Sequence, residues 1–225
     1  MPEVAIVLFS GGLDSTVALW WVRYQDWKPV PLSVDYAGRP RGEREAAREI
    51  AAVARVEILE VALPFYRDLQ AWRREGVLPG DLAGVNPVYL PAKNLLFYAI
   101  AAYYAEVLGA TRIVGGHYRH DGILFPDAST AYFARLGDLI ADGLYSHRPR
   151  LELPFLELAK DAVVQLGLAL GAPLGLTWSC YWDGPMPCGQ CEGCQEKEAA
   201  LRTVGRSEES RNDKQSSWAI KQIDG

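Results

Sequence analysis

One stretch near the start of the chain determines the fold: Val4-Ala5-Ile6-Val7-Leu8-Phe9-Ser10-Gly11-Gly12-Leu13-Asp14-Ser15-Thr16. Its first six residues are apolar, which predicts a buried strand of a parallel sheet. From Asp14 to Tyr24 the apolar residues recur at helical spacing, which predicts a helix. The two glycines therefore lie where a strand turns into a helix.

This turn has the chemistry of an anion site. The first turn of a helix leaves backbone N–H groups unpaired, and the aligned peptide dipoles make that end positive. The two glycines let an anion approach the backbone closely, while Ser10 and Ser15 add hydroxyl donors. We therefore expect the turn to bind phosphate. The alternative is a serine/glycine turn that only caps the helix, with Asp14 at its start.

The commonest nucleotide fingerprints are absent, because the turn lacks the lysine of G-x-x-x-x-G-K-[ST] and does not read G-x-G-x-x-G. Its S-G-G-x-D-S sequence resembles the pyrophosphate loop of ATP pyrophosphatases, which split ATP between the α and β phosphates and adenylate a carbonyl oxygen. The resemblance implies that the loop holds pyrophosphate and that Asp14 lies near Mg²⁺. The residues that it assigns to ATP are Phe9, Ser10, Gly11, Gly12, Leu13, Asp14, Ser15 and Thr16.

The four cysteines of the chain, Cys180, Cys188, Cys191 and Cys194, lie close together in the sequence, three of them as C-x-x-C-x-x-C. Two-residue spacings bring thiolates around one tetrahedral ion, and Cys180 completes a four-sulfur shell. We expect a structural Zn²⁺ site. An iron–sulfur cluster is the alternative, since its ligands are also cysteine thiolates. Disulfides are disfavoured, because the acidic N-terminus does not read as a secretion signal.

Composition is that of a globular protein, with 225 residues, 49% hydrophobic and 23% charged. A net charge of −5 argues against an extended nucleic-acid surface. No apolar stretch approaches the roughly 20 residues that span a bilayer. We expect a cytoplasmic protein with one domain over residues 1–205, a zinc knot at 180–194 and a polar, flexible tail at 206–225. The oligomeric state is left open, a homodimer included.

Strand and helix patterns alternate along the chain, which predicts a doubly wound parallel sheet covered by helices on both faces. After the first strand and helix, strands are expected at Val30–Val34, Val56–Val61 and Thr111–Gly115, and helices at Gly42–Ala54, Lys93–Leu108, Thr130–Asp142 and Leu156–Leu170. The segment Leu63–Leu90 is rich in proline and glycine and is expected to be an irregular flap. Ligands of such sheets lie at the carboxyl ends of the strands. The segments Ser10–Ser15, Asp35–Arg41 and Gly115–Asp127 should therefore converge.

Three further blocks make the resemblance more specific. Leu90-Pro91-Ala92-Lys93-Asn94 resembles the V-P-G/A-R/K-N block of the 7-cyano-7-deazaguanine synthases of queuosine biosynthesis. Leu158-Ala159-Lys160 resembles their L-S-K segment, and Leu176–Cys194 resembles their L-T-x-S-C-Y and C-G-x-C-x-x-C zinc block. The order holds from about Val4 to Leu201. The resemblance implies the adenine nucleotide α-hydrolase-like fold.

The resemblance also implies a reaction in which a deazapurine carboxylate and ammonia give a nitrile at the expense of ATP. Adenylation supplies the leaving group that a carboxylate lacks, and ammonia then displaces AMP. The protein contributes positioning and charge. Ser10, Asp14, Lys93 and Lys160 are the catalytic candidates, and the two lysines are expected to face phosphate oxygens. Surface charge is the alternative for the two lysines, and a structural helix start is the alternative for Asn94.

The substrate block departs from the family pattern D-x-S-G-Y-P-D-C-R. The chain retains Asp121 and Asp127 but has Ala128 and Ser129 in place of the cysteine and arginine. A serine cannot replace the two-pronged hydrogen bonding of an arginine to a carboxylate. The substrate candidates are Asn94, His117, Arg119, Asp121 and Asp127, with His120 as a further compensating cation; surface loop residues are the alternative for the histidines.

Two other functions remain open at this stage. The first is a related adenylating enzyme that activates a different carboxylate or joins a deazaguanine to another amine, which the altered block favours. The second is a non-catalytic nucleotide or nucleic-acid binding module, against which the complete Ser10–Ser15 loop and the acidic charge both argue.

Overall fold

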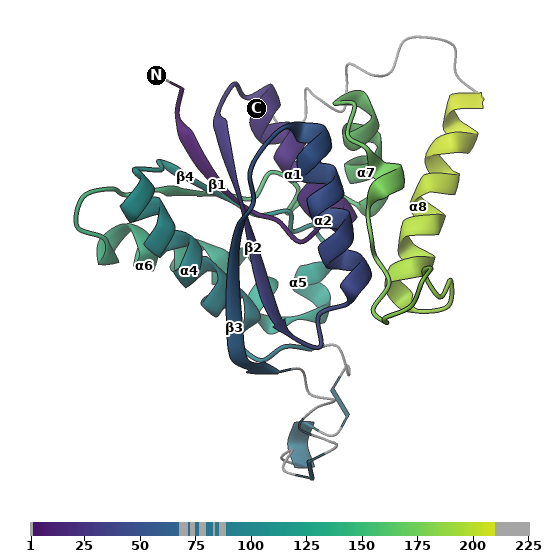
Figure 1. Cartoon of the computed structure of the whole chain (residues 1–225), viewed down its shortest axis with the longest axis horizontal. Helices are drawn as coiled ribbons and strands as arrows, with labels where there is room; N and C mark the ends of the chain where they lie inside the picture. The colour runs from purple at the N-terminus through teal and green to yellow at the C-terminus, as the bar shows by residue number, and fades with distance from the viewer. Residues whose placement is uncertain are drawn as a thin grey trace.

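A parallel five-stranded sheet forms the centre of the molecule in a computed structural model, which describes residues 2–67, 72, 75–76, 80–82, 84–85 and 89–209 (Figure 1). The strand order is β3-β2-β1-β4-β5, and every neighbouring pair is parallel. The strands are β1 (Val4–Leu8), β2 (Lys28–Ala37), β3 (Leu59–Arg67), β4 (Arg112–Val114) and β5 (Arg150–Glu152).

The apolar composition of β1 explains its central position. Ala5, Ile6 and Val7 are completely buried. Successive strand residues point to opposite faces, so Ala5 and Val7 belong to one hydrophobic core and Ile6 to the other. A strand that is apolar on both faces is stable only where helices cover both sides of the sheet.

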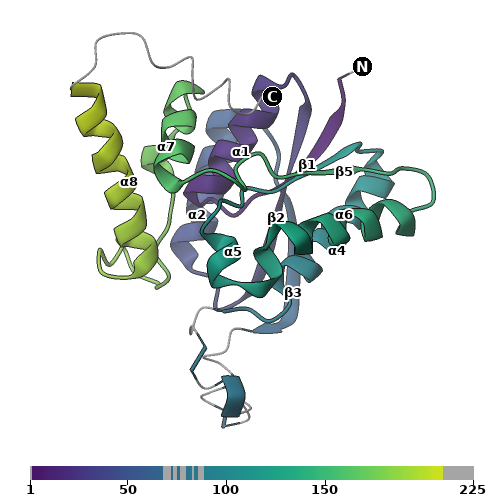
Figure 2. The same cartoon turned by 180° about the vertical axis from the view of Figure 1, so that it is seen from behind.

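Two layers of helices provide that cover (Figures 1 and 2). On one face lie α1 (Leu13–Tyr24), α2 (Arg41–Ala54) and α7 (Lys160–Ala169), with α8 (Glu192–Glu209) outside α7. On the other face lie α4 (Lys93–Leu108) and α6 (Thr130–Gly143). The short elements are α5 (Asp121–Leu124) and the 3-10 helices η1 (Gly80–Leu82), η2 (Pro126–Ala128) and η3 (Leu174–Leu176). The expected doubly wound α/β fold is confirmed.

Several elements differ from the expectation; β2, for example, extends over Lys28–Ala37 instead of Val30–Val34. The helix predicted from Leu156 begins at Lys160, because tight turns precede it and Ala159 is extended. The third strand begins at Leu59 and continues to Arg67, into the segment expected to be irregular. Strand β5 was not predicted, since three residues carry no periodicity. Helix α8 continues through Glu209, past the expected start of the tail at residue 206.

Other expectations fall outside the described residues. The expected tail beyond residue 209 is one of them. Much of the expected flap at Leu63–Leu90 is another.

The strand order reverses between β1 and β4. From β1 the chain winds through β2 to β3 at one edge, then returns through α4 to β4 and continues to β5. Ligands of open parallel sheets bind outside the carboxyl ends of the strands at such a reversal. The turn after β1 and the segment after β4 meet there, because a Cβ on Gly116 would lie 2.7 Å from the carbonyl carbon of Asp14.

Gly11 is the position in this turn at which a side chain cannot fit. Its φ is +91°, and a Cβ would lie 2.5 Å from the backbone nitrogen of Ala47 in α2. Gly171 is a matched control, because its φ is +72° and a Cβ would meet no atom within 4 Å.

We expect Gly171→Ala to lower the free energy of unfolding by about 1 kcal/mol, the cost of a left-handed alanine. Gly11→Ala adds a backbone clash and should cost about 3 kcal/mol or more. Urea unfolding of the two variants checks this difference. Equal losses would contradict the packing of the turn against α2.

Candidate active site

The Ser10–Ser15 turn is held in shape by its own hydroxyl groups. The Gly12 N–H donates to Ser10 Oγ at 3.1 Å, and the Ser15 and Thr16 hydroxyls donate to the Gly12 carbonyl at 3.0 and 2.8 Å. The α1 N-cap residue, Gly12, makes no side-chain capping hydrogen bond. The hydroxyls of Ser10 and Ser15 are thus bonded within the turn, and anion binding by this helix end stays a prediction.

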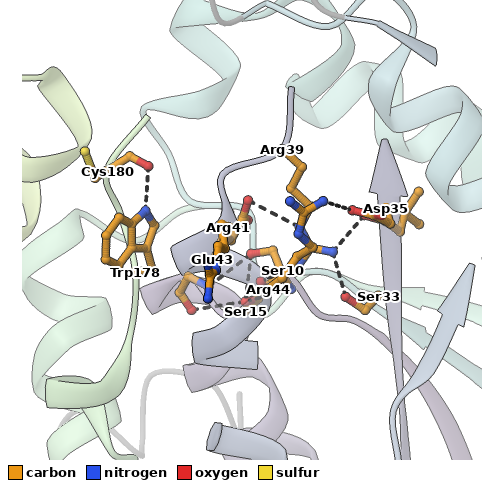
Figure 3. Close-up of polar contacts among 12 residues, drawn as sticks. Ser10, Ser15, Ser33, Asp35, Arg39, Arg41, Glu43, Arg44, Trp178 and Cys180 are labelled. Carbon is orange, nitrogen blue, oxygen red and sulfur yellow. Dashed lines mark hydrogen bonds and ion pairs between the residues drawn. The ribbon is translucent and has the colours of Figure 1, made fainter. Parts of the chain in front are cut away.

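Two distant segments hold the backbone of the turn, and sequence reasoning assigned a role to neither (Figure 3). Arg39, which follows β2, donates to the Ser10 carbonyl at 2.7 Å. Trp178, which precedes the cysteines, donates its backbone N–H to the Gly11 carbonyl at 3.0 Å. Both residues lie in segments that the sequence analysis considered. No sequence pattern, however, indicates that the Arg39 side chain or the Trp178 backbone N–H binds the turn.

Asp14 and Lys160 are brought together by the fold. Lys160 Nζ lies 2.6 Å from Asp14 Oδ2 and 4.3 Å from the centre of the Tyr118 ring. The Tyr118 hydroxyl in turn donates to Glu196 of α8 at 3.0 Å. The cation predicted to face phosphate thus lies directly beside the predicted metal-binding carboxylate.

The electrostatics of Asp14 suit a cation in addition to Lys160. Burial raises the pKa of Asp14, and the charge and hydrogen bond of Lys160 oppose that rise. The side chain keeps 24% of its surface exposed, but Oδ1 is buried without a hydrogen-bond partner. A carboxylate oxygen is an acceptor only and is a ligand that Mg²⁺ prefers. The residues present therefore fit a Mg²⁺ ion at this position.

The segment after β4 contains a second charge cluster. Asp121 Oδ2 lies 3.5 Å from His117 Nδ1 and accepts from the Tyr118 N–H at 3.2 Å. Burial alone would raise the pKa of Asp121, but the hydrogen bond and charge of His117, together with the Tyr118 N–H and the Lys93 charge, lower it. His117 is therefore already paired with a carboxylate, which reduces its capacity to bind an acidic substrate.

The other substrate candidates divide into structural and accessible groups. Asp127 accepts from the Asn94 backbone N–H at 3.0 Å, and the Asn94 amide donates to the Asp127 carbonyl at 2.7 Å. These two residues join the start of α4 to η2, so the structural alternative for Asn94 is supported. Arg119 is exposed, and His120 lies within 4.8 Å of two carboxylates, Glu192 and Glu196.

The four cysteines form one compact cluster. Their Sγ atoms all lie within 4.8 Å of one another, and two of the pairs, Cys188–Cys194 and Cys180–Cys191, are 4.0 Å apart. Four thiolates around one Zn²⁺, each about 2.3 Å from the ion, would lie about 3.8 Å apart. The donor set therefore fits a single tetrahedral ion. All four thiols are free in the structure, which agrees with a metal site and not with the disulfide alternative.

Backbone N–H groups surround these sulfurs. Cys180 Sγ accepts from Trp182 and Cys188, and Cys188 Sγ accepts from Gln190 and Cys191, at 3.4–3.5 Å. The N–H groups of Gln190 and Cys191 lower the pKa of Cys188 to about 6, whereas burial raises the pKa of Cys194 to about 12. These hydrogen bonds favour thiolates, the form that binds metal.

A short segment connects the cysteine cluster to the turn after β1. The Trp178 indole N–H donates to the Cys180 carbonyl at 2.9 Å (Figure 3). The indole covers Gly42 of α2, where a Cβ would lie 2.5 Å from the ring. The Lys197 ammonium of α8 donates to the Thr177 carbonyl at 2.5 Å. The segment around Trp178, whose backbone N–H binds the Gly11 carbonyl, is therefore connected to the cysteine cluster.

The parallel sheet, covered by helices on both faces and with a glycine turn at its strand-order reversal, defines a protein of the doubly wound α/β class. Residues 4–205 match the sequence model of the family described as "Queuosine biosynthesis protein QueC". The chain belongs to this family.

The curated relatives have one consistent name. A 7-cyano-7-deazaguanine synthase of Synechococcus sp. (strain CC9902) is 36% identical over 214 residues, which are 91% of this chain and 95% of that protein. The synthase of Acidobacterium capsulatum is 35% identical over 209 residues, or 85% and 89% of the two chains.

Solved structures support the fold. A predicted subunit of a tRNA methyltransferase from Methanocaldococcus jannaschii superimposes with a TM-score of 0.50 at 14% identity, covering 75% of each chain.

In the described part of the chain, none of the helices combines the length and apolar character that crossing a membrane requires.

We expect Cys191→Ser to reduce bound metal to well below one ion per chain and to lower the free energy of unfolding by several kcal/mol, because metal binding contributes directly to folding. Gln190→Ala is the control, since the side chain between the two cysteines is exposed. Elemental analysis and thermal unfolding measure both effects. Full metal content in Cys191→Ser would contradict the four-sulfur site.

We expect Lys160→Met to move the acid limb of Mg²⁺–ATP binding to higher pH. Lys160 lowers the pKa of Asp14, so its removal raises that pKa further. The pKa of Asp14 is already higher in the folded than in the unfolded protein, so ionising Asp14 lowers the free energy of unfolding as the pH rises. Lys160→Met should therefore lose more of this free energy at pH 7 than at pH 4.

Lys160→Arg is the control for this experiment, since it retains the positive charge. Titration calorimetry across pH provides the binding profile. Superimposable profiles for Lys160→Met and the unchanged protein would show that the pair does not control Asp14.

Proposed function

We propose that this chain is an ATP-dependent carbon–nitrogen ligase that converts 7-carboxy-7-deazaguanine and ammonia to 7-cyano-7-deazaguanine. Family membership over residues 4–205 and the names of the relatives support this function. The observation that carries it is the geometry of the Ser10–Ser15 turn, in which the N-terminal end of α1 lies beside the Asp14–Lys160 pair.

The chemistry requires a leaving group on the carboxylate. In the proposed reaction, the substrate carboxylate oxygen attacks the α phosphate of ATP and pyrophosphate departs. Ammonia then displaces AMP to give an amide, and a second adenylation allows dehydration to the nitrile. We assign pyrophosphate to the turn formed by residues 9–16, where the positive helix end favours negative charge. The protein works by positioning and charge stabilisation.

Two metals complete the proposal. Mg²⁺ at Asp14 Oδ1 would neutralise phosphate charge, with Lys160 beside it. Lys93, exposed at the start of α4 and near enough to lower the pKa of Asp121, is assigned to the substrate side. Zn²⁺ in the cysteine cluster is assigned a structural role, because four thiolates leave no open coordination position.

Arg119 is our choice for the cation that binds the substrate carboxylate. It is exposed on the segment after β4, and no described residue forms an ion pair with it. Its guanidinium can bind a carboxylate with two hydrogen bonds. His117 is already paired with Asp121, and His120 lies among carboxylates.

A second function is favoured by one observation. Ala128 is 1% exposed, and Ser129 Oγ accepts the Tyr132 N–H as the cap of α6. Neither residue supplies the charge expected at this place in the family pattern. A related enzyme that adenylates a different carboxylate, or joins a deazaguanine to another amine, would retain the same ATP site.

The remaining assignments concern the protein as a whole. We propose one domain over residues 1–205 and a cytoplasmic location, as befits a biosynthetic enzyme. A homodimer is also proposed, because the outer faces of α4 and α6 expose Tyr103, Val107 and Leu139.

Incubation with ATP, Mg²⁺, ammonia and 7-carboxy-7-deazaguanine should give the nitrile, AMP and pyrophosphate, detected by mass spectrometry. Asp14→Asn is the control and should reduce AMP formation by about 100-fold or more. Arg119→Ala should raise the KM for the acid about tenfold or more while ATP binding is unchanged.

ATP binding without AMP or nitrile would exclude this acid as substrate. Candidate carboxylates and amines would then be assayed for AMP release. AMP formation in Asp14→Asn at the normal rate would contradict the assignment of the loop.

A further inference from the structure

Arg39 is an arginine in the interior of the molecule. It is 4% exposed and lies between the end of β2 and the start of α2. Its Nη1 donates to Ser33 Oγ and to the Val34 carbonyl, both at 3.0 Å, and its Nη2 donates to the Ser10 carbonyl at 2.7 Å (Figure 3). One guanidinium therefore joins β2 to the turn after β1.

The charge of Arg39 is only partly balanced. Glu43, one helical turn further on, lies 3.5 Å from Arg39 Nε and is itself 19% exposed. Burying a guanidinium is costly, and an apolar side chain would fill the same space without that cost. A packing role alone therefore does not explain an arginine here. The planar fork is the property that an apolar residue or a lysine lacks.

The orientation of the carbonyl groups in the turn shows what the Arg39 guanidinium does. The C=O and N–H of a trans peptide point in opposite directions, so holding the Ser10 carbonyl toward Arg39 directs the Gly11 N–H the other way. The Gly11 carbonyl is held by Trp178, and the Gly12 carbonyl by Ser15 and Thr16. All three carbonyls thus accept hydrogen bonds from protein groups, which keeps their negative ends away from an anion.

The Ser10–Gly11 peptide has a glycine on its C-terminal side, which lowers the steric barrier to its rotation. Gly11 has no Cβ and a φ of +91°, a region that glycine enters and leaves without steric cost. Rotation would turn the Ser10 carbonyl oxygen toward the side to which the Gly11 N–H now points, where the proposed function places phosphate. Arg39 Nη2 is the group that holds this oxygen back.

We propose that Arg39 is a positioning residue for the β and γ phosphates of ATP, acting through the Ser10 carbonyl and not by contact with the nucleotide. The inference rests on the proposed function only in taking ATP as the ligand. On this proposal, the buried Arg39 side chain gives the turn its selectivity for ligands with a pyrophosphate group over AMP.

The test compares Arg39→Lys and Arg39→Met with Ser33→Ala. Ser33→Ala removes one hydrogen bond of the same guanidinium but leaves its bond to the Ser10 carbonyl. Titration calorimetry with ATP, pyrophosphate and AMP is carried out below the unfolding temperature of every variant. The expected result is a loss of ATP and pyrophosphate affinity of about tenfold in Arg39→Lys, more in Arg39→Met, and little in Ser33→Ala.

AMP affinity should stay within about twofold in all three variants, because AMP has no β or γ phosphate. A merely structural role would lower the affinity for all three ligands together, or lower only the unfolding temperature, and either result overturns the proposal. If Arg39→Met does not fold, Arg39→Lys against Ser33→Ala still provides the comparison.

The experiment is independent of turnover. A protein that binds ATP and makes no nitrile contradicts the proposed function and leaves the Arg39 comparison valid. A protein that makes nitrile, with Arg39→Lys unchanged in pyrophosphate affinity, contradicts only the role of Arg39.

Discussion

The structure depends on how the turn after β1 is held: its carbonyls accept hydrogen bonds from other parts of the protein, as the proposed binding of pyrophosphate by its N–H groups requires. A strand that leads directly into a helix supplies the N–H groups. The carbonyls need other partners, and here these come from β2, from the segment before the cysteines and from the helix itself. The arrangement of three distant parts of the chain around Gly11 follows from that need.

The same constraint gives the cysteine cluster a meaning beyond stability. Trp178 binds the Gly11 carbonyl, and its indole binds the Cys180 carbonyl. An ion that orders the cysteines would therefore also order a partner of the turn. The cluster lies outside the sheet, yet two hydrogen bonds of Trp178 connect it to the turn at the carboxyl end of β1.

Charge in the site is arranged as a set of pairs. Asp14 is paired with Lys160, and Asp121 with His117, so the acidic groups nearest the turn each have a basic partner. Burial by itself raises the pKa of both carboxyls, but the net shift of the pKa differs between them. It raises the pKa of Asp14, whereas His117, the Tyr118 N–H and Lys93 together lower that of Asp121. Oδ1 of Asp14 is buried without a hydrogen-bond partner, which leaves an acceptor for a cation.

The sequence by itself determined the parallel sheet, the turn after β1, the cysteine set and the family, because each depends on neighbouring residues or short spacings. Only the tertiary structure decided which candidates act together. It paired Asp14 with Lys160 across 146 positions, assigned Asn94 and Asp127 to a helix start, and placed Arg39 against Ser10. Contacts between distant segments carry no local periodicity, so their partners become visible only when the chain is folded.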